Sequence, residues 1–423
     1  MHDACRVFGN KWGDQSLDDR SWRYPDNRSN NWRIYKMNLD TLFKSGIIAF
    51  DNSSLSGTEW TFSAAGDYGI LPEPGKLIAA DGGAALAGNI RKLTEADFSI
   101  VNLEIALTGS AEISGRGVHG DREIFMNFQK LAPFTVYSLA NNHIRDAGAE
   151  ALRLTIERFN SENILYVGAG LNQTEAEAPL FAEVKGVKLG ILAFAQNENQ
   201  IADSAAPGAA ELLSEKVITA AGKLVGQCAV PVVIMHEGFE FMNFPRTQFK
   251  KLCHRLASLG VKLVIGHHSH VPQGIEKIGD ALIFYSLGNF LFDQPHFAPY
   301  SWSRKSFVPV IKFKGDKIAG LEIRPLTIEL NPLQVRPVAA DERAAMLDHL
   351  KANCEIIADD ALLKNEMDIF FTNILLPEFF GYLQHYGNEN KGDFSEMIKR
   401  FKKQVTVHKL FADFLSLYSN NNG

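Results

Sequence analysis

The chain has 423 residues, 46% of them hydrophobic and 22% charged, which is enough for one large globular domain with additions. A net charge of -6 with dispersed lysines and arginines disfavours nucleic-acid binding, because phosphate recognition needs clustered basic residues. The four cysteines form no Cys-x-x-Cys pair, which disfavours both a disulfide framework and a zinc knuckle.

Residues 1–60 are predicted to form an N-terminal arm. They are rich in Asn, Asp, Arg and Trp and show little apolar periodicity. They contain no apolar run of the signal-peptide kind, and the chain has no stretch of about 18 apolar residues that could form a membrane helix. We therefore expect a cytoplasmic protein without a membrane span.

From Thr61 onward, short β-type runs alternate with segments of helical period. The clearest helical segment is 245–259, where apolar residues recur at spacings of three and four up to the stop signal Gly260. A second helix is predicted over 149–159. This alternation predicts an α/β fold. The predicted strands cover residues 61–65, 98–103, 135–139, 188–195, 230–235, 262–265 and 281–287.

The last quarter of the chain changes character. Residues 308–313 and 318–323 predict a β-hairpin around the turn Lys314-Gly-Asp-Lys317. From Asp341 to Tyr418 the pattern is helical. We therefore divide the chain into the N-terminal arm, a main domain and a C-terminal helical extension, with bounds 1–60, 61–330 and 331–423.

Ligand-type residues follow most of the predicted strands. Five of the twelve histidines lie at three strand ends, in segments that finish at His143, His236 and His270. Loops at the carboxyl ends of strands are where open α/β sheets place ligand groups. A dinuclear hydrolytic site needs carboxylate, imidazole and amide ligands around two ions about 3.5 to 4 Å apart. The candidates in chain order are Asp67, Glu104, Asn142, His143, His236, His268 and His270.

Each of these residues also has a simpler interpretation. A single histidine at a strand end is more often a hydrogen-bonded structural residue than a ligand. Asp67 could be a turn residue after its strand, and Asn142 could cap the helix that begins at Ala149. The polar loop 114–123 could position an anionic substrate or be a solvated surface loop.

Six segments in order resemble the CapA-type family of poly-γ-glutamate capsule biosynthesis proteins, which is related to the calcineurin-like metallophosphoesterases. The resemblance covers roughly residues 60–300. It implies a four-layer sandwich in which two β-sheets are flanked by helices. The segments are Gly66-Asp67, Asn102-Leu-Glu104, Ala140-Asn-Asn-His-Ile-Arg-Asp146, His236-Glu-Gly-Phe-Glu240, Gly266-His-His-Ser-His-Val271 and Tyr285-Ser-Leu-Gly-Asn289.

The resemblance also implies a role for each residue. Asp67 and His270 would bind one ion, and Glu104 would bridge to a second ion. The second ion would be held by Asn142, His236 and His268. His143 would be the general acid, with Asp146 orienting its imidazole. Gly69 stands where the metallophosphoesterase pattern has a histidine. Further candidates for substrate contact are Glu240, His267, Gln273, Glu276 and Asn289, with His267 outside the ligand shell.

These roles imply a metal-dependent hydrolase with two divalent ions, Mn, Fe, Zn or Mg. Its substrate would be an anionic small molecule or polymer, cleaved at a phosphoester or γ-glutamyl-type bond. The alternative is a non-catalytic factor for capsule polymer assembly or export that retains the fold. The sequence contains no indication of the oligomeric state.

Overall fold

The computed structural model describes residues 39–50, 55–109, 117–198, 200–292, 294, 297, 300 and 302–375. The chain divides into two compact units, residues 1–34 and 35–423, and all described residues belong to the second. The predicted arm is therefore described only from residue 39, and the helical pattern predicted after residue 375 lies outside the described residues.

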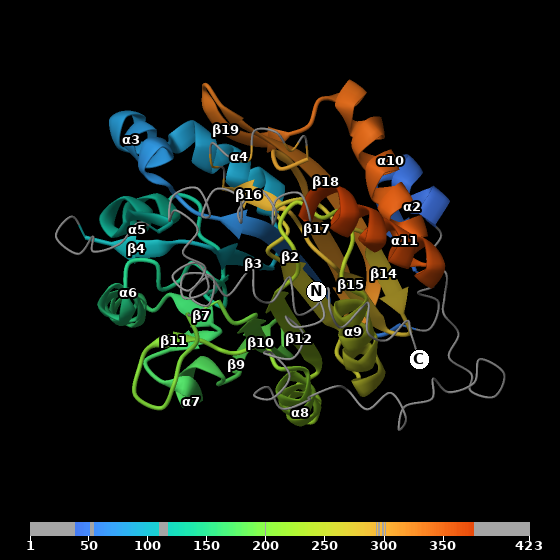
Figure 1. The fold of residues 1–423 in the computed structure, drawn as a ribbon, viewed down its shortest axis with the longest axis horizontal. Helices are drawn as coiled ribbons and strands as arrows, with labels where there is room; N and C mark the ends of the chain where they lie inside the picture. The colour runs from blue at the N-terminus through green and yellow to red at the C-terminus, as the bar shows by residue number, and fades with distance from the viewer. Residues whose placement is uncertain are drawn as a thin grey trace, which may run out of the picture. The chain divides into compact units, whose positions relative to one another are not determined.

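The larger sheet joins strands from both ends of the described chain (Figure 1). Its order is β1-β18-β17-β2-β3-β6-β7, with β16 beside β2 and β19 beside β18. The neighbours β2, β3, β6 and β7 run parallel, whereas β17 and β18 form an antiparallel hairpin beside them. The strands are β1 (Ile47–Ala49), β2 (Glu59–Tyr68), β3 (Phe98–Leu103), β6 (Val136–Ser138), β7 (Leu165–Val167), β16 (Asn289–Leu291), β17 (Lys305–Lys314), β18 (Lys317–Leu330) and β19 (Leu333–Pro337).

The second sheet has six strands in the order β14-β15-β13-β12-β10-β9. Its four central strands are parallel and almost wholly apolar, as expected for strands that are buried on both faces. The strands are β9 (Leu180–Val184), β10 (Val187–Ala195), β12 (Val230–His236), β13 (Leu263–His267), β14 (Ile275–Ile278) and β15 (Ala281–Phe284). Two small two-stranded sheets pair β4 (Ala106–Thr108) with β5 (His119–Asp121), and β8 (Ala169–Gly170) with β11 (Gly208–Ala209).

Helices cover the outer faces of the sheets, and one apolar core lies between the sheets. Alternate residues of β10 show this division: Ile191 and Ala193 belong to the core shared by the two sheets, whereas Leu192 and Phe194 pack with α8 and α9. The α/β class with two helix-flanked sheets is thereby confirmed. The helices are α2 (Leu39–Ser45), α3 (Pro72–Asp81), α4 (Ala84–Thr94), α5 (Arg122–Gln129), α6 (Ala149–Ser161), α7 (Gln173–Ala176), α8 (Ser214–Val225), α9 (Thr247–Leu259), α10 (Ala340–Ile357) and α11 (Asp360–Phe370), followed by the π-helical turn η2 (Phe371–Leu375).

Most predicted elements coincide with observed ones to within a few residues, and two strands extend the sheet beyond the predicted main domain. The strand β1 precedes the predicted main domain in the chain and pairs with β18. The strand β19 follows that domain and also pairs with β18. Both are short edge strands, which give little periodic signal in a sequence. The helices α10 and α11 then follow in the C-terminal segment, as expected.

The C-terminal helices are held against α9 by a buried lysine. The ammonium of Lys250 donates to the carbonyl of Ile357 at 2.5 Å and to Asp360 Oδ1 at 2.7 Å. A small apolar cluster then joins the loop after β12 to the end of α11, because Met242 packs with Met367 there. The C-terminal segment therefore supports a loop that leaves β12 beside His236.

Two glycines allow strand ends to approach each other closely. A Cβ on Gly66 would lie 1.9 Å from the carbonyl oxygen of Gly288, and one on Gly266 would lie 2.0 Å from that of Tyr285. Each glycine directly precedes a ligand-type residue. The glycines therefore set how closely β2 and β13 approach their neighbours at the ends that carry Asp67 and His267.

We expect Gly66→Ala to lower the free energy of unfolding by about 1–3 kcal/mol, because its methyl group would push the end of β2 away from Gly288. The matched control is Gly222→Ala in the exposed part of α8, where an added Cβ meets no atom within 4 Å. That change should raise stability by about 0.4–1 kcal/mol. Chemical denaturation of both variants measures the difference, and equal stabilities would contradict the close-approach argument.

Candidate metal centre

The first group of ligand-type side chains combines Asp67, Glu104 and His270. Asp67 lies near the end of β2, Glu104 directly follows β3, and His270 lies in the turn after β13. One ligand atom from each lies within 4.8 Å of the others. His270 Nδ1 is 3.2 Å from Asp67 Oδ2, and His270 Nε2 is 3.7 Å from Glu104 Oε1. All three side chains are buried, so the group is closed off from bulk water.

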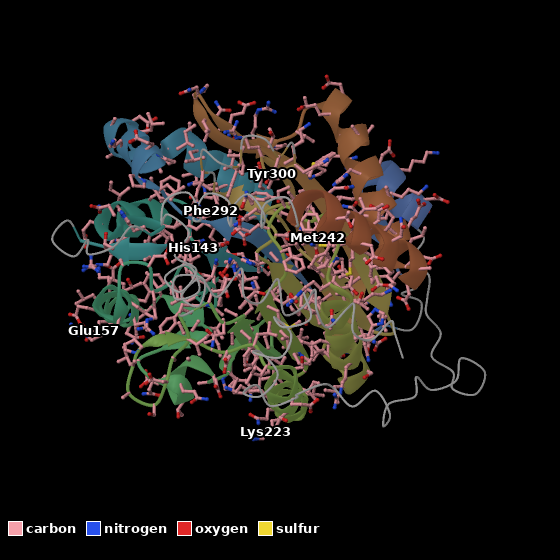
Figure 2. The ribbon with its side chains drawn as sticks, viewed as in Figure 1. His143, Glu157, Lys223, Met242, Phe292 and Tyr300 are labelled. Atoms are coloured by element: carbon pink, nitrogen blue, oxygen red, sulfur yellow. The ribbon has the colours of Figure 1, made fainter. Side chains whose placement is uncertain are left out.

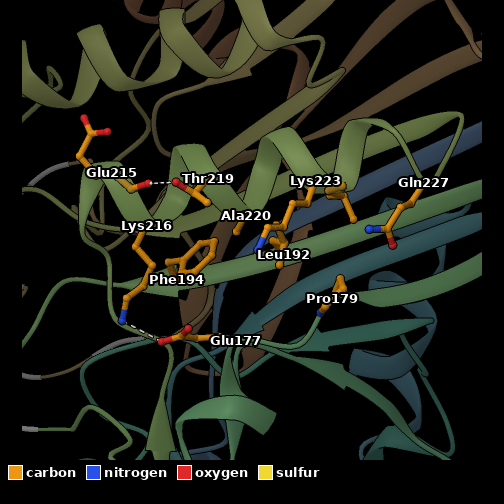
Figure 3. Close-up of a pocket in the computed structure, with 11 residues that line it drawn as sticks. Glu177, Pro179, Leu192, Phe194, Glu215, Lys216, Thr219, Ala220, Lys223 and Gln227 are labelled. Atoms are coloured by element: carbon orange, nitrogen blue, oxygen red, sulfur yellow. Dashed lines mark hydrogen bonds and ion pairs between the residues drawn. The ribbon is translucent and has the colours of Figure 1, made fainter.

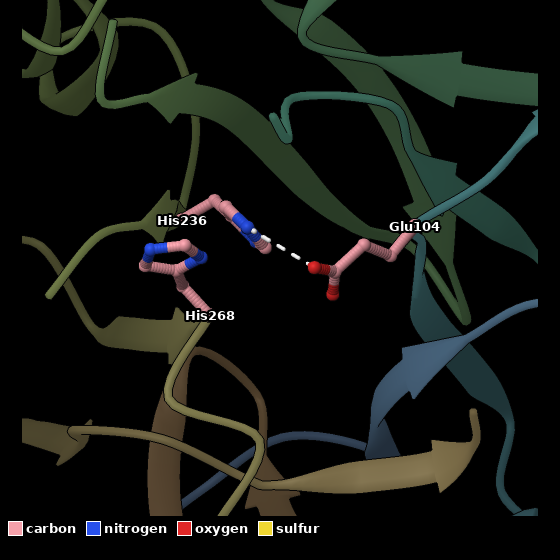
Figure 4. Close-up of side chains that lie close together, drawn as sticks. All are labelled: Glu104, His236 and His268. Carbon is pink, nitrogen blue, oxygen red and sulfur yellow. Dashed lines mark ion pairs between the residues drawn. The ribbon is translucent and has the colours of Figure 1, made fainter. Parts of the chain in front are cut away.

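The second group combines the same Glu104 with His236 and His268 (Figure 4). His236 is the last residue of β12, and its Nε2 atom lies 3.4 Å from Glu104 Oε1. The rings of His236 and His268 lie 4.6 Å apart between centroids. Glu104 therefore belongs to both groups and lies between the histidines of the two groups.

The two carboxyl groups have opposite pKa shifts. Burial raises the pKa of Glu104 well above its usual value, and the neighbouring charge of Asp67 adds to this effect. Burial also opposes ionisation of Asp67, but hydrogen bonds and charge from His267 and His270 outweigh it and hold that pKa well below its usual value. At neutral pH, the ion-free site thus favours a negative charge on Asp67 over one on Glu104.

Burial also keeps the imidazoles of the second group neutral. It lowers the pKa of His268 to about 4, and together with the charge of His268 it holds the pKa of His236 well below the usual histidine value. In His270 burial also acts to lower the pKa, but the hydrogen bond and the charge of Asp67, together with contributions from Glu240 and Asn289, outweigh burial and raise the pKa. Neutral imidazoles have a lone pair for a cation, so His236 and His268 are in the form that binds metal.

The buried polar atoms fit a divalent cation. Glu104 Oε1, His270 Nε2 and His268 Nδ1 have no hydrogen-bond partner within the described part of the chain. Leaving such an atom buried without a partner costs about 1–3 kcal/mol, and more for a charged group. Their residues all belong to the two groups, and oxygen and imidazole donors are the ligands that Mn, Fe and Zn accept.

Asparagine side chains hold the carboxylates and imidazoles in place. Asn102 Nδ2 lies 2.9 Å from Asp67 Oδ1 and 3.2 Å from Glu104 Oε2, so one amide connects the two acidic side chains. Asn289 Oδ1 lies 3.0 Å from His270 Nδ1, which makes Asn289 a partner of that imidazole. Asn102 was not a predicted site residue, although its position two residues before Glu104 on a buried strand was a usable signal.

The segment after β6 brings a third kind of side chain to the second group. Asn142 Oδ1 lies 2.9 Å from His236 Nε2. His143 follows, and its Nδ1 atom lies 2.8 Å from Asp146 Oδ2. Asp146 also accepts a hydrogen bond of 2.6 Å from the backbone N–H of Val118. The structure therefore brings Asn142, His143 and Asp146 to the same end of the sheets as the two ligand groups.

The loop after β10 contributes two residues that the sequence analysis missed. Gln196 Nε2 lies 3.0 Å from His268 Nε2, and Glu198 Oε1 lies 3.6 Å from the same nitrogen. β10 was predicted over 188–195, but no ligand-type residue was assigned to its end. The available signal was the polar run that directly follows an apolar strand.

Backbone strain is concentrated in the histidine turn. His268 has a φ of 92° and His270 a φ of 56°, both in the left-handed region that non-glycine residues rarely adopt. Such conformations cost of the order of 1–3 kcal/mol each and persist only where the surroundings enforce them. The strain is what allows both imidazoles of one short turn to reach Glu104.

The remaining predicted residues lie at different distances from the centre. His267 Nδ1 is 3.1 Å from Asp67 Oδ1, on the oxygen opposite to His270. Glu240 is exposed, but its charge raises the pKa of Glu104. Gln273 donates to the carbonyl of Met242 and so supports the loop after β12.

Glu276 is not brought to the centre as predicted. Its carboxylate on β14 accepts hydrogen bonds from His254 Nε2 at 2.8 Å and from the Tyr285 hydroxyl at 2.5 Å. β14 is the edge strand of the smaller sheet. Because His254 belongs to α9, the carboxylate of Glu276 faces that helix. The sequence placed it near the site only because it follows the histidine turn closely along the chain.

Gly69 is enclosed by apolar side chains. A Cβ there would lie 3.1 Å from Ile105 Cβ and 3.2 Å from a ring carbon of Phe292. A histidine at this position would therefore clash with its neighbours. The first group accordingly lacks a contribution from this position.

An aromatic surface flanks the imidazoles. The ring of Phe292 stacks on His270 at 5.3 Å and lies 6.3 Å from His143 (Figure 2). Phe241, which has a φ of 61°, stacks on Tyr300 at 3.7 Å. These rings give one side of the site an apolar boundary next to the charged groups.

Two cavities differ in their relation to the site. The smaller, of about 290 Å³, is lined by His143 and Asp146 together with Leu71, Pro72, Gly117, Val118, His119 and Gln294. The larger, of about 540 Å³, lies between α8 and β10 and contains the ion pair of Lys216 with Glu177 (Figure 3). Neither lining includes one of the clustered ligands, but the smaller cavity borders His143 and Asp146, which lie at the same end of the sheets as the two ligand groups.

His119 belongs to the polar loop predicted over 114–123, and it lines this smaller cavity. The positions 114–116 are outside the described residues. None of the helices among the described residues combines the length and apolar character needed to cross a bilayer.

Relatives of this chain include proteins that are named for capsule and polyglutamate-type synthesis. The CapA capsule biosynthesis protein of Bacillus anthracis is 32% identical over 208 residues, which is 47% of this chain and 49% of that protein. The CapA protein for PGA biosynthesis of Bacillus subtilis is 28% identical over 242 residues, 56% of this chain and 62% of that one. A probable polyglutamine synthesis accessory protein of Mycobacterium tuberculosis is 27% identical over 278 residues, 60% of this chain and 71% of its own length. The chain thus spans about half to three-fifths of the two Bacillus relatives.

Solved structures are more distant. A hypothetical protein from Thermus thermophilus has a TM-score of 0.40 and 17% identity over 63% of this chain and 98% of its own. A phosphatase from Mycoplasma pneumoniae has a TM-score of 0.42 and 14% identity over 64% of this chain and 94% of its own.

The family of bacterial capsule synthesis proteins called PGA_cap matches residues 61–294, more than half of this chain, and the chain belongs to that family.

Proposed function

We propose that this chain is a metal-dependent hydrolase that acts in the synthesis of a polyglutamate capsule polymer. The observation that carries the proposal is the position of Glu104, whose carboxylate belongs to both ligand groups. In the proposed site, Asp67, Glu104 and His270 hold one divalent ion, and Glu104, Asn142, His236 and His268 hold the other. Two such ions, when bound, polarise a substrate oxygen and lower the pKa of water.

His143 is proposed as the general acid. Its Nδ1 atom lies 2.8 Å from Asp146 Oδ2, so Nε2, which is 3.4 Å from Asn142 Nδ2, is the nitrogen that would face a substrate atom. Both residues line the smaller cavity, so a leaving group placed there can receive a proton from His143. Asp146 orients the imidazole and is itself held by the backbone of Val118.

The proposed substrate is an anionic phosphoester or a γ-glutamyl-type amide. The names of the Bacillus relatives refer to capsule and PGA biosynthesis, which supports a glutamate polymer or its precursor. The two proposed ions would offset the negative charge of such a substrate. The apolar surface of Phe292 would cover the methylene part of a glutamyl side chain.

A non-catalytic assembly factor is the second candidate. It is favoured by the packing around Gly69, because the first group cannot gain a histidine there. The number of ions separates the candidates. Two ions per chain support the hydrolase, whereas one or none supports the assembly factor.

We expect His143→Ala to lower kcat by about 10²- to 10⁴-fold on an aryl phosphate or a γ-glutamyl oligomer, because proton transfer to the leaving group is lost. The metal content should stay unchanged. The matched control is His254→Gln, since His254 on α9 pairs with Glu276 and lies outside both groups. Unaltered kcat in His143→Ala, or a fully metallated wild type that cleaves neither substrate, would count against the hydrolase.

Binding of Mn²⁺ should release a proton. Burial and Asp67 raise the pKa of Glu104, so the ion-free chain keeps this proton at pH values where an ordinary glutamate has lost it. The cation has to displace that proton, and the apparent affinity should therefore rise with pH until the pKa of Glu104 is reached.

Calorimetric titration with Mn²⁺ in two buffers of different ionisation heat measures this proton. The binding heats should differ between the buffers below the pKa values of Glu104 and His270, both of which are raised, and converge above both. In Glu104→Gln the buffer-dependent contribution of this group should vanish. Identical heats at every pH in the wild type would contradict the raised pKa.

A further inference from the structure

Glu198 lies beside the second ligand group without belonging to it. β10 and β12 are parallel neighbours, with Ala195 in register with His236. The backbone N–H of Gln196 donates to the carbonyl of His236 at 3.0 Å, so the chain leaves β10 directly next to that histidine. Glu198 follows two residues later, and 13% of its side chain is exposed.

The side chain of Gln200 fixes this loop. Its Oε1 atom accepts from the backbone N–H of Glu198 at 2.7 Å, and its Nε2 atom donates to the carbonyl of Gln196 at 2.8 Å. Gln200 is buried, and its own carbonyl accepts from the N–H of Ala209 at 3.0 Å. Glu198 is therefore held in place by the backbone and not only by its own carboxylate.

The carboxylate of Glu198 contacts two residues of the second group. Its Oε2 atom accepts from Asn142 Nδ2 at 3.2 Å. Its Oε1 atom lies 3.6 Å from His268 Nε2 and accepts from Gln196 Nε2 at 2.5 Å. Glu198 thus contacts both Asn142 and His268 without being one of the clustered ligands itself.

Each contact determines which atom of the neighbour faces the ligand group. A carboxylate accepts hydrogen bonds and cannot donate them, so only the NH₂ end of the Asn142 amide can face Glu198. The oxygen then faces His236 Nε2, at 2.9 Å. In His268, Nε2 lies 3.6 Å from Glu198 Oε1 and 3.0 Å from the amide nitrogen of Gln196, so both neighbours outside the group contact this nitrogen. The other ring nitrogen, Nδ1, is the buried atom without a partner among the described residues.

We infer that Glu198 is a positioning residue for the second ion, a role that rests on the proposed two-ion site. It holds the amide of Asn142 and the imidazole of His268 in the orientations that bind a cation, and it adds a negative charge just outside the ligands. The contacts of Glu198 within the described part of the chain include no hydrogen bond or ion pair to Asp67 or His270, so its direct contacts are confined to ligands of one of the two ions.

Glu198→Ala should lower the affinity for the second ion by about 10- to 100-fold, which is the usual effect of removing a partner of a metal ligand. The affinity for the first ion should stay unchanged. Glu198→Gln keeps the size and one acceptor oxygen but loses the charge, so its affinity should lie between those of Glu198→Ala and the wild type. Titration of the full chain with Co²⁺ measures both ions, since calorimetry resolves the stoichiometry and the visible absorption reports the ligand geometry of each.

The matched control is Glu211→Gln. Glu211 accepts from Asn197 at 3.0 Å in the same region and is not a member of either ligand group. This variant should bind both ions as the wild type does. Thermal unfolding of all variants shows whether the fold is retained, and Glu198→Gln keeps the comparison valid if Glu198→Ala does not fold.

Three outcomes would overturn the inference. Unchanged affinity for both ions in Glu198→Gln and Glu198→Ala would show that Glu198 does not position the ligands. An equal loss of affinity for both ions, together with a lower unfolding temperature, would show a merely structural role. A wild-type chain that binds no Co²⁺ would overturn the proposed function as well, whereas a wild type with two ions and insensitive variants would overturn this inference alone.

Discussion

The buried carboxylate of Glu104 is the group on which the arrangement of the site depends. It directly follows β3 in the middle of the larger sheet, and it faces histidines carried by the smaller one. A buried carboxylate close to a second one, Asp67, is unfavourable unless positive charge or protons compensate. The ion-free chain responds by raising the pKa of Glu104. A divalent cation on either side compensates the same charge without a proton, which is why cation binding and proton release are coupled here.

The two sheets position these groups because their parallel strands end at the same edge. Asp67 is in register with Asn102, and His236 is in register with His267, so each sheet carries a pair of polar residues at one end. Gly66 allows the end of β2 to approach Gly288, the residue directly before β16. The apolar core between the sheets then keeps the two pairs facing each other. A long-range feature, the packing of one sheet on the other, thus creates the site.

A layer of amides and carboxylates surrounds the ligands and limits their freedom. Asn102, Asn289 and Glu198 contact the ligand side chains from outside, and each contact selects one orientation of its neighbour. Such partners matter because the ligands must be held before the cation arrives. The loop after β12 is supported in turn by Met242, which packs against Met367 of the C-terminal helix α11. The helical extension therefore contributes to the rigidity of the site from a distance.

The ligand-type residues, their order and the strands that precede them were readable from the sequence, because apolar runs that stop at a histidine or a carboxylate are local patterns. The hairpin around Lys314 and Lys317 and the helix α9 were readable for the same reason. The family was also recognisable from local motifs, because each motif is a short run of residues along the chain.

Tertiary structure alone decided which residues meet. Glu198 comes from a loop whose sequence has no motif, and it reaches His268 only because β10 lies next to β12 in the smaller sheet. Glu276 is close to the histidine turn in sequence, yet β14 carries it to the sheet edge beside α9. Strand order and register, which arise from packing between residues far apart in the chain, have no local signature, and they determine the outer contacts of the site.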